Sequence, residues 1–279
     1  AMGKPEYLTF SSAELLPREE VLEVEKKKQR LQIGLPKETC MQEKRVVLTP
    51  DAVNLLTENG HEVVVEVGAG ESAHYSDQDY SEAGARIAHS AKEVYQCQMI
   101  LKVEPPSAEE IALMKHRQTL ISALQLKTQD RGYFKALMDK KITALSFENM
   151  ADEDGILPVV RSMSEIAGNT SILIAAEYLS NANDGKGFML GGVSGVPPTE
   201  VLIIGAGTVG IFAARTALGL GANVKVFDRS LSKLRRMQQM LNNMPIYTCI
   251  IQPKILEKAL MRCDVAIGAI RSDGGRTPC

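Results

Sequence analysis

The sequence predicts an α/β protein built from two doubly wound parallel-sheet domains. Short apolar runs alternate with helical patterns from Gln32 onward, which is the order of βαβ units and favours a mainly parallel sheet. Another apolar run, Val201–Ile204, leads directly into the turn Gly205–Gly210, which has the spacing G-x-G-x-x-G. With 279 residues, 44% of them apolar, the chain is long enough to bury two cores.

The first domain is predicted over residues 31–162, after an extension over residues 1–30. Charges alternate in blocks between Pro17 and Lys28, as on a solvated surface helix, so the extension is expected to be helical. Apolar runs predict strands at Gln32–Leu35, Glu62–Val67, Met99–Val103, Thr119–Leu126 and Thr143–Ser146. The intervening helices are predicted at Pro50–Asn59, Asp77–Gly84, near Ala91, Ala108–Met114 and Gln129–Lys140.

The second domain is predicted over residues 163–279. The long, largely apolar helix Ser162–Leu179 contains Gly168 and is expected to bridge the two domains, and the glycine-rich loop Gly185–Pro198 follows it. Strands are predicted at Val201–Ile204, Asn223–Phe227, Ile246–Ile250 and Asp264–Ala269. A doubly wound domain commonly has about six strands, so this one is expected to be truncated at its C-terminal end.

The glycine turn resembles a dinucleotide-binding fingerprint, and each glycine has a physical role in it. Gly205 allows the tight turn, Gly207 lets backbone N–H groups approach a pyrophosphate, and Gly210 lets the next helix pack closely on the strand. The phosphates would lie at the positive end of that helix, beside Thr208 and Val209. The second domain is therefore predicted to be a Rossmann NAD-binding domain.

The choice of dinucleotide is predicted from the end of the next strand. Asp228 follows Gly210 by roughly 20 residues, where a carboxylate can accept hydrogen bonds from the ribose hydroxyls and would repel a 2′-phosphate. NAD is therefore favoured over NADP. Arg229 weakens this preference because its guanidinium could pair with a phosphate. A glycine-rich turn without a ligand is the alternative, but the strand, the helix Ile211–Leu220 and the acidic residue together argue against it.

Composition argues against several other classes of protein. A net charge of −2 with mixed signs, and no Trp, gives neither a basic face nor a stacking platform for nucleic acid. No apolar run reaches the roughly 20 residues of a membrane span, and no signal-peptide pattern is present, so a cytoplasmic enzyme is expected. The five cysteines and four histidines show no metal-ligand spacing. The cysteines are expected to be reduced thiols, with Cys97 and Cys263 buried beside strands.

Four stretches together resemble the alanine dehydrogenase and transhydrogenase α-subunit family. They occur in order from about residue 32 to the end, with family-like spacing, and they are Pro36-Lys37-Glu38 with Glu43–Val46, Ile100–Pro105, Met163–Gly168 and Leu190–Pro198. Met-Ser-Glu-Ile-Ala-Gly at residues 163–168 is similar to the alanine dehydrogenase form, whereas transhydrogenase subunits resemble Arg-Ala-Gln-Ser-Met-Asp there. Alanine dehydrogenase is therefore the closer relative on this evidence.

The resemblance implies that Arg45 and Lys102 hold the substrate. An arginine fork suits a carboxylate, and a lysine at a strand end can stabilise charge on a carbonyl oxygen during hydride transfer. Gln125 stands where the family has a histidine, so it could donate a hydrogen bond but could not exchange a proton near neutral pH. On the cofactor side, the resemblance places Ser164 and the loop Gly191–Val196 near the nucleotide, and Ala269 near the nicotinamide.

The resemblance and the residue chemistry together predict NAD-dependent oxidative deamination of L-alanine to pyruvate and ammonia. The family also implies a homo-oligomer, a hexamer, without a nucleic-acid or membrane partner. Three alternatives stay open: a non-catalytic NAD-binding sensor or assembly module, a transhydrogenase-like subunit, and a dehydrogenase for another amino acid. The acid/base group is not fixed, because Gln125 replaces the histidine; Lys102, bound water or a downstream aspartate of the family could serve.

Overall fold

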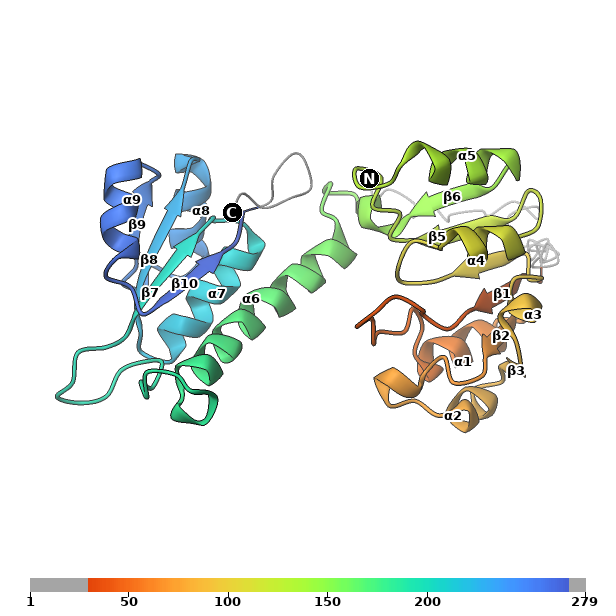
Figure 1. Cartoon of the computed structure of the whole chain (residues 1–279), viewed down its shortest axis with the longest axis horizontal. Coiled ribbons are helices and arrows are strands. Elements are labelled where there is room, and N and C mark those ends of the chain that lie inside the picture. The colour runs from red at the N-terminus through yellow and green to blue at the C-terminus, as the bar shows by residue number, and fades with distance from the viewer. Residues whose placement is uncertain (1–29, 271–279) are drawn as a thin grey trace, which may run out of the picture.

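The computed structural model describes residues 30–270, which form two lobes connected by a long helix (Figure 1). The helical extension predicted over residues 1–30 lies outside the described residues, apart from Arg30. Each lobe contains one sheet, and all ladder pairings between the described strands are parallel. The predicted α/β class with two parallel sheets is therefore confirmed.

The first lobe contains a six-stranded sheet in the order β3-β2-β1-β4-β5-β6. Its strands are β1 (Gln32–Leu35), β2 (Glu62–Glu66), β3 (Arg86–Ala88), β4 (Met99–Leu101), β5 (Thr119–Ser122) and β6 (Thr143–Ser146). Its helices are α1 (Pro50–Glu58), α2 (Asp77–Glu82), α3 (Ala91–Val94), α4 (Ala108–Leu113) and α5 (Arg131–Asp139), with 3₁₀ turns η1 (Glu71–Ala73) and η2 (Phe147–Asn149). The strand order reverses between β1 and β4, which makes this the topological switch point of the sheet.

Local sequence signals explain where these elements start. The side chain of Ser76 begins α2 in a capping box with Asp79, and Ser107 begins α4 in a capping box with Glu110. Val63, Val64 and Val65 are all buried in β2, because helices cover both faces of a parallel sheet. The capping box at α4 also fixes Glu110 on the first turn of that helix, close to the end of β4.

The second lobe contains a four-stranded sheet in the order β10-β7-β8-β9. Its strands are β7 (Glu200–Ile204), β8 (Asn223–Asp228), β9 (Tyr247–Ile250) and β10 (Val265–Gly268). Its helices are α7 (Thr208–Gly219), α8 (Leu231–Met240) and α9 (Pro253–Leu260). Buried alanines on α7, including Ala213 and Ala217, let this helix lie close to the sheet beneath it. The switch point of this sheet lies between β7 and β10.

The connecting helix α6 (Pro158–Leu179) packs along α7 and ends before the 3₁₀ turn η3 (Asn181–Asn183) (Figure 1). A Cβ on Gly168 would lie 2.5 Å from the carbonyl oxygen of Val209, so only glycine permits this approach of the two helices. Ile172 and Leu179 complete the buried face of α6. The bridging helix predicted at Ser162–Leu179 is therefore confirmed, with a start four residues earlier, at Pro158, where proline is well suited to a first helical turn.

Several element boundaries differ from those predicted. The three-residue strand β3 was not predicted, and neither was α8 or α9. The strand predicted over Thr119–Leu126 ends at Ser122, because Gln125 adopts a left-handed φ of 47° that no strand residue has. The apolar residue Leu124 beyond this point is buried by packing against the core rather than by the sheet.

The composition also led to expectations about membrane spans, cysteines and metal sites, which concern residues 30–270 here. No helix in this part of the chain is long and apolar enough to cross a membrane. Its four cysteines are free thiols, of which Cys97 is buried as predicted and Cys263 only half-buried. No group of three or more acidic, cysteine or histidine side chains is arranged to hold a metal ion in the described residues.

Candidate functional site

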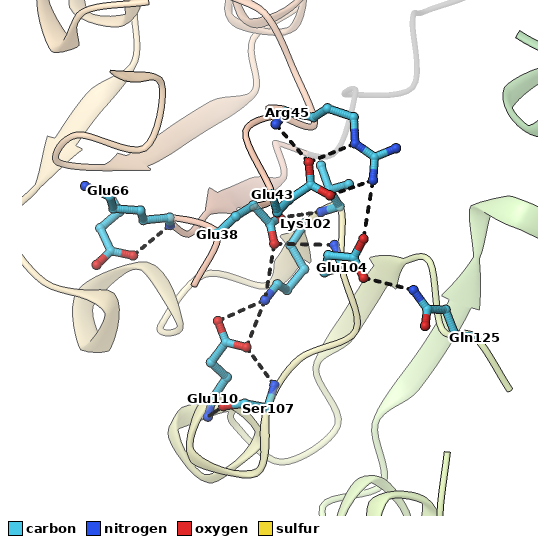
Figure 2. Close-up of polar contacts among 11 residues, drawn as sticks. Glu38, Glu43, Arg45, Glu66, Lys102, Glu104, Ser107, Glu110 and Gln125 are labelled. Atoms are coloured by element: carbon cyan, nitrogen blue, oxygen red, sulfur yellow. Dashed lines mark hydrogen bonds and ion pairs between the residues drawn. The ribbon is translucent and has the colours of Figure 1, made fainter. Parts of the chain in front are cut away.

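The candidate substrate site lies at the switch point of the first sheet. β1 ends at Leu35 and β4 ends at Leu101, and these two strands are hydrogen-bonded neighbours. In open parallel sheets, ligands bind outside the carboxyl ends of the strands at such a reversal. The segments that leave these two strands carry most of the charged side chains shown in Figure 2.

Lys102 lies in a buried group with two carboxylates, Glu38 and Glu110, which we call the lysine cluster. Its Nζ donates to both carboxylate oxygens of Glu110, at 2.9 and 2.8 Å, and lies 3.6 Å from Oε2 of Glu38. The lysine side chain is 2% exposed. Burial raises the pKa of Glu38, and the nearby Lys102 ammonium partly offsets that effect.

This arrangement does not favour the substrate role that the resemblance implied for Lys102. In Figure 2 the lysine side chain extends toward Glu110, on the opposite side of Glu38 from Arg45. A substrate carbonyl at Nζ would share the ammonium group with the two carboxylates that hold it here. In this structure Lys102 holds Glu38 and Glu110, and its contact with a substrate stays a prediction.

Arg45 is the accessible cation of the site. It is held by Glu43 and Glu104, and with Gln125 these residues form what we call the arginine site. Nε and Nη2 of Arg45 donate to the two carboxylate oxygens of Glu43, at 2.8 and 2.6 Å. Nη2 also lies 3.3 Å from Oε1 of Glu104. Nη1 of Arg45 contacts Sδ of Met163 at 3.5 Å, and the arginine side chain is 52% exposed, so part of the guanidinium is accessible to a ligand.

Glu104 connects Arg45 to Gln125. Its Oε2 accepts a hydrogen bond of 2.9 Å from Nε2 of Gln125 (Figure 2). The backbone N–H groups of Val103 and Glu104 donate to Glu38, so the lysine cluster fixes the chain segment that carries Glu104. The structure thus brings the predicted residues Arg45 and Gln125 together, with a carboxylate between them that the sequence analysis did not assign.

The two carboxyl groups beside Arg45 have opposite pKa shifts. Hydrogen bonds from Arg45 lower the pKa of Glu43 to about 2. Burial raises the pKa of Glu104, and its hydrogen bond with Glu43 and the negative charge of Glu43 raise it further. Two neighbouring carboxyl groups with divergent proton affinity are typical of sites that move protons.

The predicted cofactor turn has the tight geometry that its glycines implied. Gly205 has φ of 117°, and a Cβ there would lie 2.4 Å from the carbonyl oxygen of Ala269. A Cβ on Gly210 would lie 1.9 Å from the carbonyl oxygen of Gly205. The space around Gly207 is open. The turn therefore tolerates no side chain on its sheet side and is accessible at its centre.

Asp228 at the end of β8 anchors this turn. Its Oδ2 accepts a 2.7 Å hydrogen bond from the backbone N–H of Ala206, and its Oδ1 accepts one of 2.7 Å from Ser230. The side chain is half-buried, whereas the neighbouring Arg229 is exposed. The predicted ribose-binding carboxylate thus lies beside the glycine turn, as the fingerprint requires.

The other predicted cofactor residues lie around the same edge. Thr208 begins α7 and lines a pocket together with Ser164 of α6, between these helices and α8; Val209 follows Thr208 and is half-buried. The Ser164 hydroxyl donates to the carbonyl oxygen of Val160 at 2.7 Å. Ala269 follows β10, and its N–H donates to Ile204 at the end of β7, which places it at the second switch point.

Four residues of the site were not predicted as site residues from the sequence, and all of them carry carboxylates: Glu38, Glu43, Glu104 and Glu110. Three of them fall inside or beside the motifs that carry the family resemblance, which was the signal available in the sequence. More generally, charged residues that closely follow a buried strand, such as Glu104 after β4, indicate a site at the carboxyl end of that strand. Their partners could not be identified before the fold placed β1 beside β4.

Comparison with known proteins agrees with this architecture. The description "Alanine dehydrogenase/PNT, N-terminal domain" matches residues 34–167, and "Alanine dehydrogenase/PNT, C-terminal domain" matches residues 171–279. A protein named alanine dehydrogenase from Mycobacterium tuberculosis is 38% identical over 249 residues, which cover 89% of this chain and 67% of that protein. Another, from Methanococcus maripaludis, is 39% identical over 247 residues, covering 88% of this chain and 66% of that protein.

Solved structures give the same relationship. An L-alanine dehydrogenase superimposes with a TM-score of 0.81 at 38% identity, over 89% of this chain and 68% of the other. A transhydrogenase from Sinorhizobium meliloti superimposes with a TM-score of 0.75 at 26% identity, over 88% of this chain and 72% of the other. The chain thus spans about two thirds of the length of the relatives named alanine dehydrogenase. From its two lobes, its site and these matches, the chain belongs to the alanine dehydrogenase/PNT family.

Proposed function

We propose that this protein is an NAD-dependent amino-acid dehydrogenase that converts L-alanine to pyruvate and ammonia. The observation that carries the proposal is the pairing of an accessible arginine fork at one switch point with a glycine turn and acidic strand end at the other. The similarity to proteins named alanine dehydrogenase supports L-alanine as the substrate. Alanine has a small side chain and one carboxylate, which Arg45 can bind as a planar fork.

The residues of the second lobe fit NAD. The open space at Gly207 gives a pyrophosphate access to the backbone N–H groups at the start of α7, beside Thr208 and Val209. Asp228 would accept hydrogen bonds from the adenosine ribose, and Ser164 and Ala269 would lie along the rest of the molecule. When bound, NAD supplies a hydride acceptor at its nicotinamide ring.

Within the first lobe, Arg45 would bind the substrate carboxylate and Gln125 would add a neutral hydrogen bond. Lys102 would act as a positioning residue, since it holds Glu38, which in turn binds the backbone of residues 103–104. Closure of the two lobes on the substrate would exclude water during hydride transfer. We further propose a homo-oligomer, a hexamer, as the assembly.

A non-catalytic NAD-binding sensor or assembly module is the second candidate. The enclosed position of Lys102 and the glutamine at position 125 favour it, because neither side chain can exchange a proton with a ligand at the open fork. A transhydrogenase-like subunit is less favoured, because residues 163–168 have the other form. A dehydrogenase for a different amino acid would use the same site with another side-chain pocket.

The test is to follow NADH absorbance while a panel of L-amino acids is offered with NAD to the full-length protein. Reduction with alanine in preference to the rest of the panel is the expected result. Reduction with another amino acid would retain the reaction and change the substrate. If no amino acid of the panel gives NADH formation, while fluorescence shows that the protein binds NADH, the dehydrogenase would be rejected and the sensor favoured.

A further inference from the structure

The charges around the first switch point are unbalanced in favour of carboxylates. Two cations, Arg45 and Lys102, face four carboxyl groups, two on each cation. The lysine cluster is largely buried, with Glu38 8% and Glu110 10% exposed, whereas Arg45 is 52% exposed. Arg45 and the groups that contact it are therefore the more accessible part of the site.

Within the arginine site, Glu43 binds Arg45 closely, whereas Glu104 contacts Arg45 only at a longer distance. Glu43 accepts two short hydrogen bonds from Arg45. Because these bonds lower the pKa of Glu43, its carboxylate stays ionised and offsets the guanidinium charge. Glu104 makes a single, longer contact of 3.3 Å with Arg45 and accepts one hydrogen bond from Gln125. Its side chain is 20% exposed. Glu104 is thus the carboxylate that a ligand can reach.

A ligand with a carboxylate alone would add negative charge to a site that already has a surplus of it. An amino acid brings an ammonium group one carbon away from its carboxylate, and the adjacent Glu104 and Arg45 carry the opposite charges to these two groups. Gln125 cannot take the ammonium proton, so the group that accepts it in the proposed reaction is still to be assigned.

We propose, building on the dehydrogenase function, that Glu104 binds the α-ammonium group of the substrate and accepts a proton from it. The N–H bond breaks and an O–H bond forms on Glu104, leaving a neutral amine. The amine lone pair then forms the C=N bond as the Cα–H bond breaks, and the hydride leaves with its electron pair to NAD⁺, the oxidant. The iminium product takes up water and releases ammonium and the keto acid, and Glu104 returns its proton to water.

The electrostatic surroundings of Glu104 suit this role. Glu43 and Glu38 face it with negative charge, Arg45 faces it with positive charge, and Gln125 faces it as a neutral donor. Burial and the negative neighbours raise the pKa of Glu104 above its ordinary value, which increases its affinity for a proton. Arg45 acts in the other direction and partly offsets this rise in the pKa of Glu104.

The test compares Glu104→Gln with Glu109→Gln, a nearby exposed glutamate, in the full-length protein. Glutamine keeps the size and hydrogen bonding of Glu104 but cannot accept a proton. We expect Glu104→Gln to lower kcat/KM for L-alanine at least about 100-fold and to abolish its loss at acidic pH, with NADH binding and Tm retained. Glu109→Gln should leave kcat/KM and its pH profile unchanged. A Glu104→Gln protein with the wild-type pH profile and kcat/KM would overturn the proposal.

A binding measurement decides the role of Glu104 even if turnover is absent. Calorimetric titration with L-alanine and with pyruvate, without dinucleotide, separates the ammonium contact from the carboxylate contact. We expect Glu104→Gln to weaken L-alanine binding roughly tenfold and to leave pyruvate binding equal or tighter. Equal effects on the two ligands would overturn the ammonium contact. Wild-type protein that binds alanine selectively through Glu104 but never reduces NAD would reject the dehydrogenase and keep this contact.

Discussion

Lys102 is a charged residue whose contacts are determined by its burial. The family resemblance implied an ammonium group that contacts a substrate, and in the structure this group lies between Glu38 and Glu110. A buried cation is stable only with carboxylate partners and satisfied hydrogen bonds. Its Nζ donates two hydrogen bonds to Glu110 and forms an ion pair with Glu38, so these contacts stabilise the first lobe.

We expect Lys102→Met to destabilise the protein by about 3–5 kcal/mol, because it leaves two buried carboxylates without a cation. Chemical unfolding at pH 7 would measure this loss. The double variant Lys102→Met/Glu110→Gln should recover part of the lost stability, because one of the two unpaired buried carboxylates is then removed. A Lys102→Met protein of wild-type stability with reduced activity would contradict the cluster and restore the substrate role.

Glu43 gives a pH-dependent prediction. Its pKa is lowered to about 2 by Arg45, against an ordinary value of 4.5, so the folded state favours the ionised form. The corresponding stability is fully present above pH about 4.5 and is lost as pH falls through about 2. Wild-type protein should therefore exceed Glu43→Gln in stability at pH 7, and the difference should shrink as pH falls from 4.5 to 2.

Chemical unfolding across this pH range would test the prediction, with Glu82→Gln on α2 as the control. The control should differ little from wild type at any pH, because Glu82 is exposed and lies far from the arginine site in the sequence. A Glu43→Gln difference that is constant with pH would show that Glu43 contributes through packing and not through its charge.

At the scale of the element, the glycine turn was the most predictable feature. The spacing G-x-G-x-x-G after an apolar strand specified a tight turn and close helix packing, and the contacts of Gly205 and Gly210 show both. Strand ends were less predictable: Val103 and Leu124 are apolar, yet they pack outside the strands. The short strand β3 has only one fully buried residue, Ala88, so it carried almost no periodic signal.

The partners of charged side chains were the least predictable part of the site. Glu38 and Lys102 are far apart in the sequence and meet only because β1 pairs with β4. Likewise, Gln125 reaches Glu104 because the chain turns through a left-handed residue after β5. Motif spacing indicated which segments matter, and the sheet order determined which of their side chains touch.

Two glycines of the same turn predict opposite phenotypes. Gly210→Ala should lower the Tm, since its Cβ would lie 1.9 Å from the carbonyl oxygen of Gly205, which backbone constraints hold in place. Gly207→Ala should keep the wild-type Tm, because the space there is open, and should weaken NADH binding if a pyrophosphate lies against it. Thermal unfolding and NADH fluorescence titration distinguish them. Normal NADH affinity in Gly207→Ala would reject the proposed phosphate site.

At the scale of the whole molecule, α6 has two different faces. One face packs on α7 through Gly168 and Ile172, whereas apolar side chains on the other are exposed, among them Ile166, Leu173 and Tyr178. A long helix with an unpartnered apolar stripe favours association. This observation supports the proposed homo-oligomer, and we expect α6 to form part of its interface.

We expect Ile166→Glu combined with Tyr178→Glu to reduce the oligomer to smaller species, because these side chains are 57% and 70% exposed in the isolated chain. Light scattering after size-exclusion chromatography of the full-length protein would measure the mass. Met138→Glu on α5, a residue that is 74% exposed, is the matched control and should leave the mass unchanged. An unchanged mass in the double variant would place the interface elsewhere.

The bond from Ala206 to Asp228 has a consequence for how cofactor preference could change. One carboxylate both shapes the glycine turn and, in the proposed function, recognises the ribose. Replacing it to admit NADP would therefore also release the backbone N–H that it holds, and affinity for either dinucleotide would fall together. A change of preference in this lineage would need a compensating substitution that re-anchors the turn, so the switch is at least a two-step mutational path.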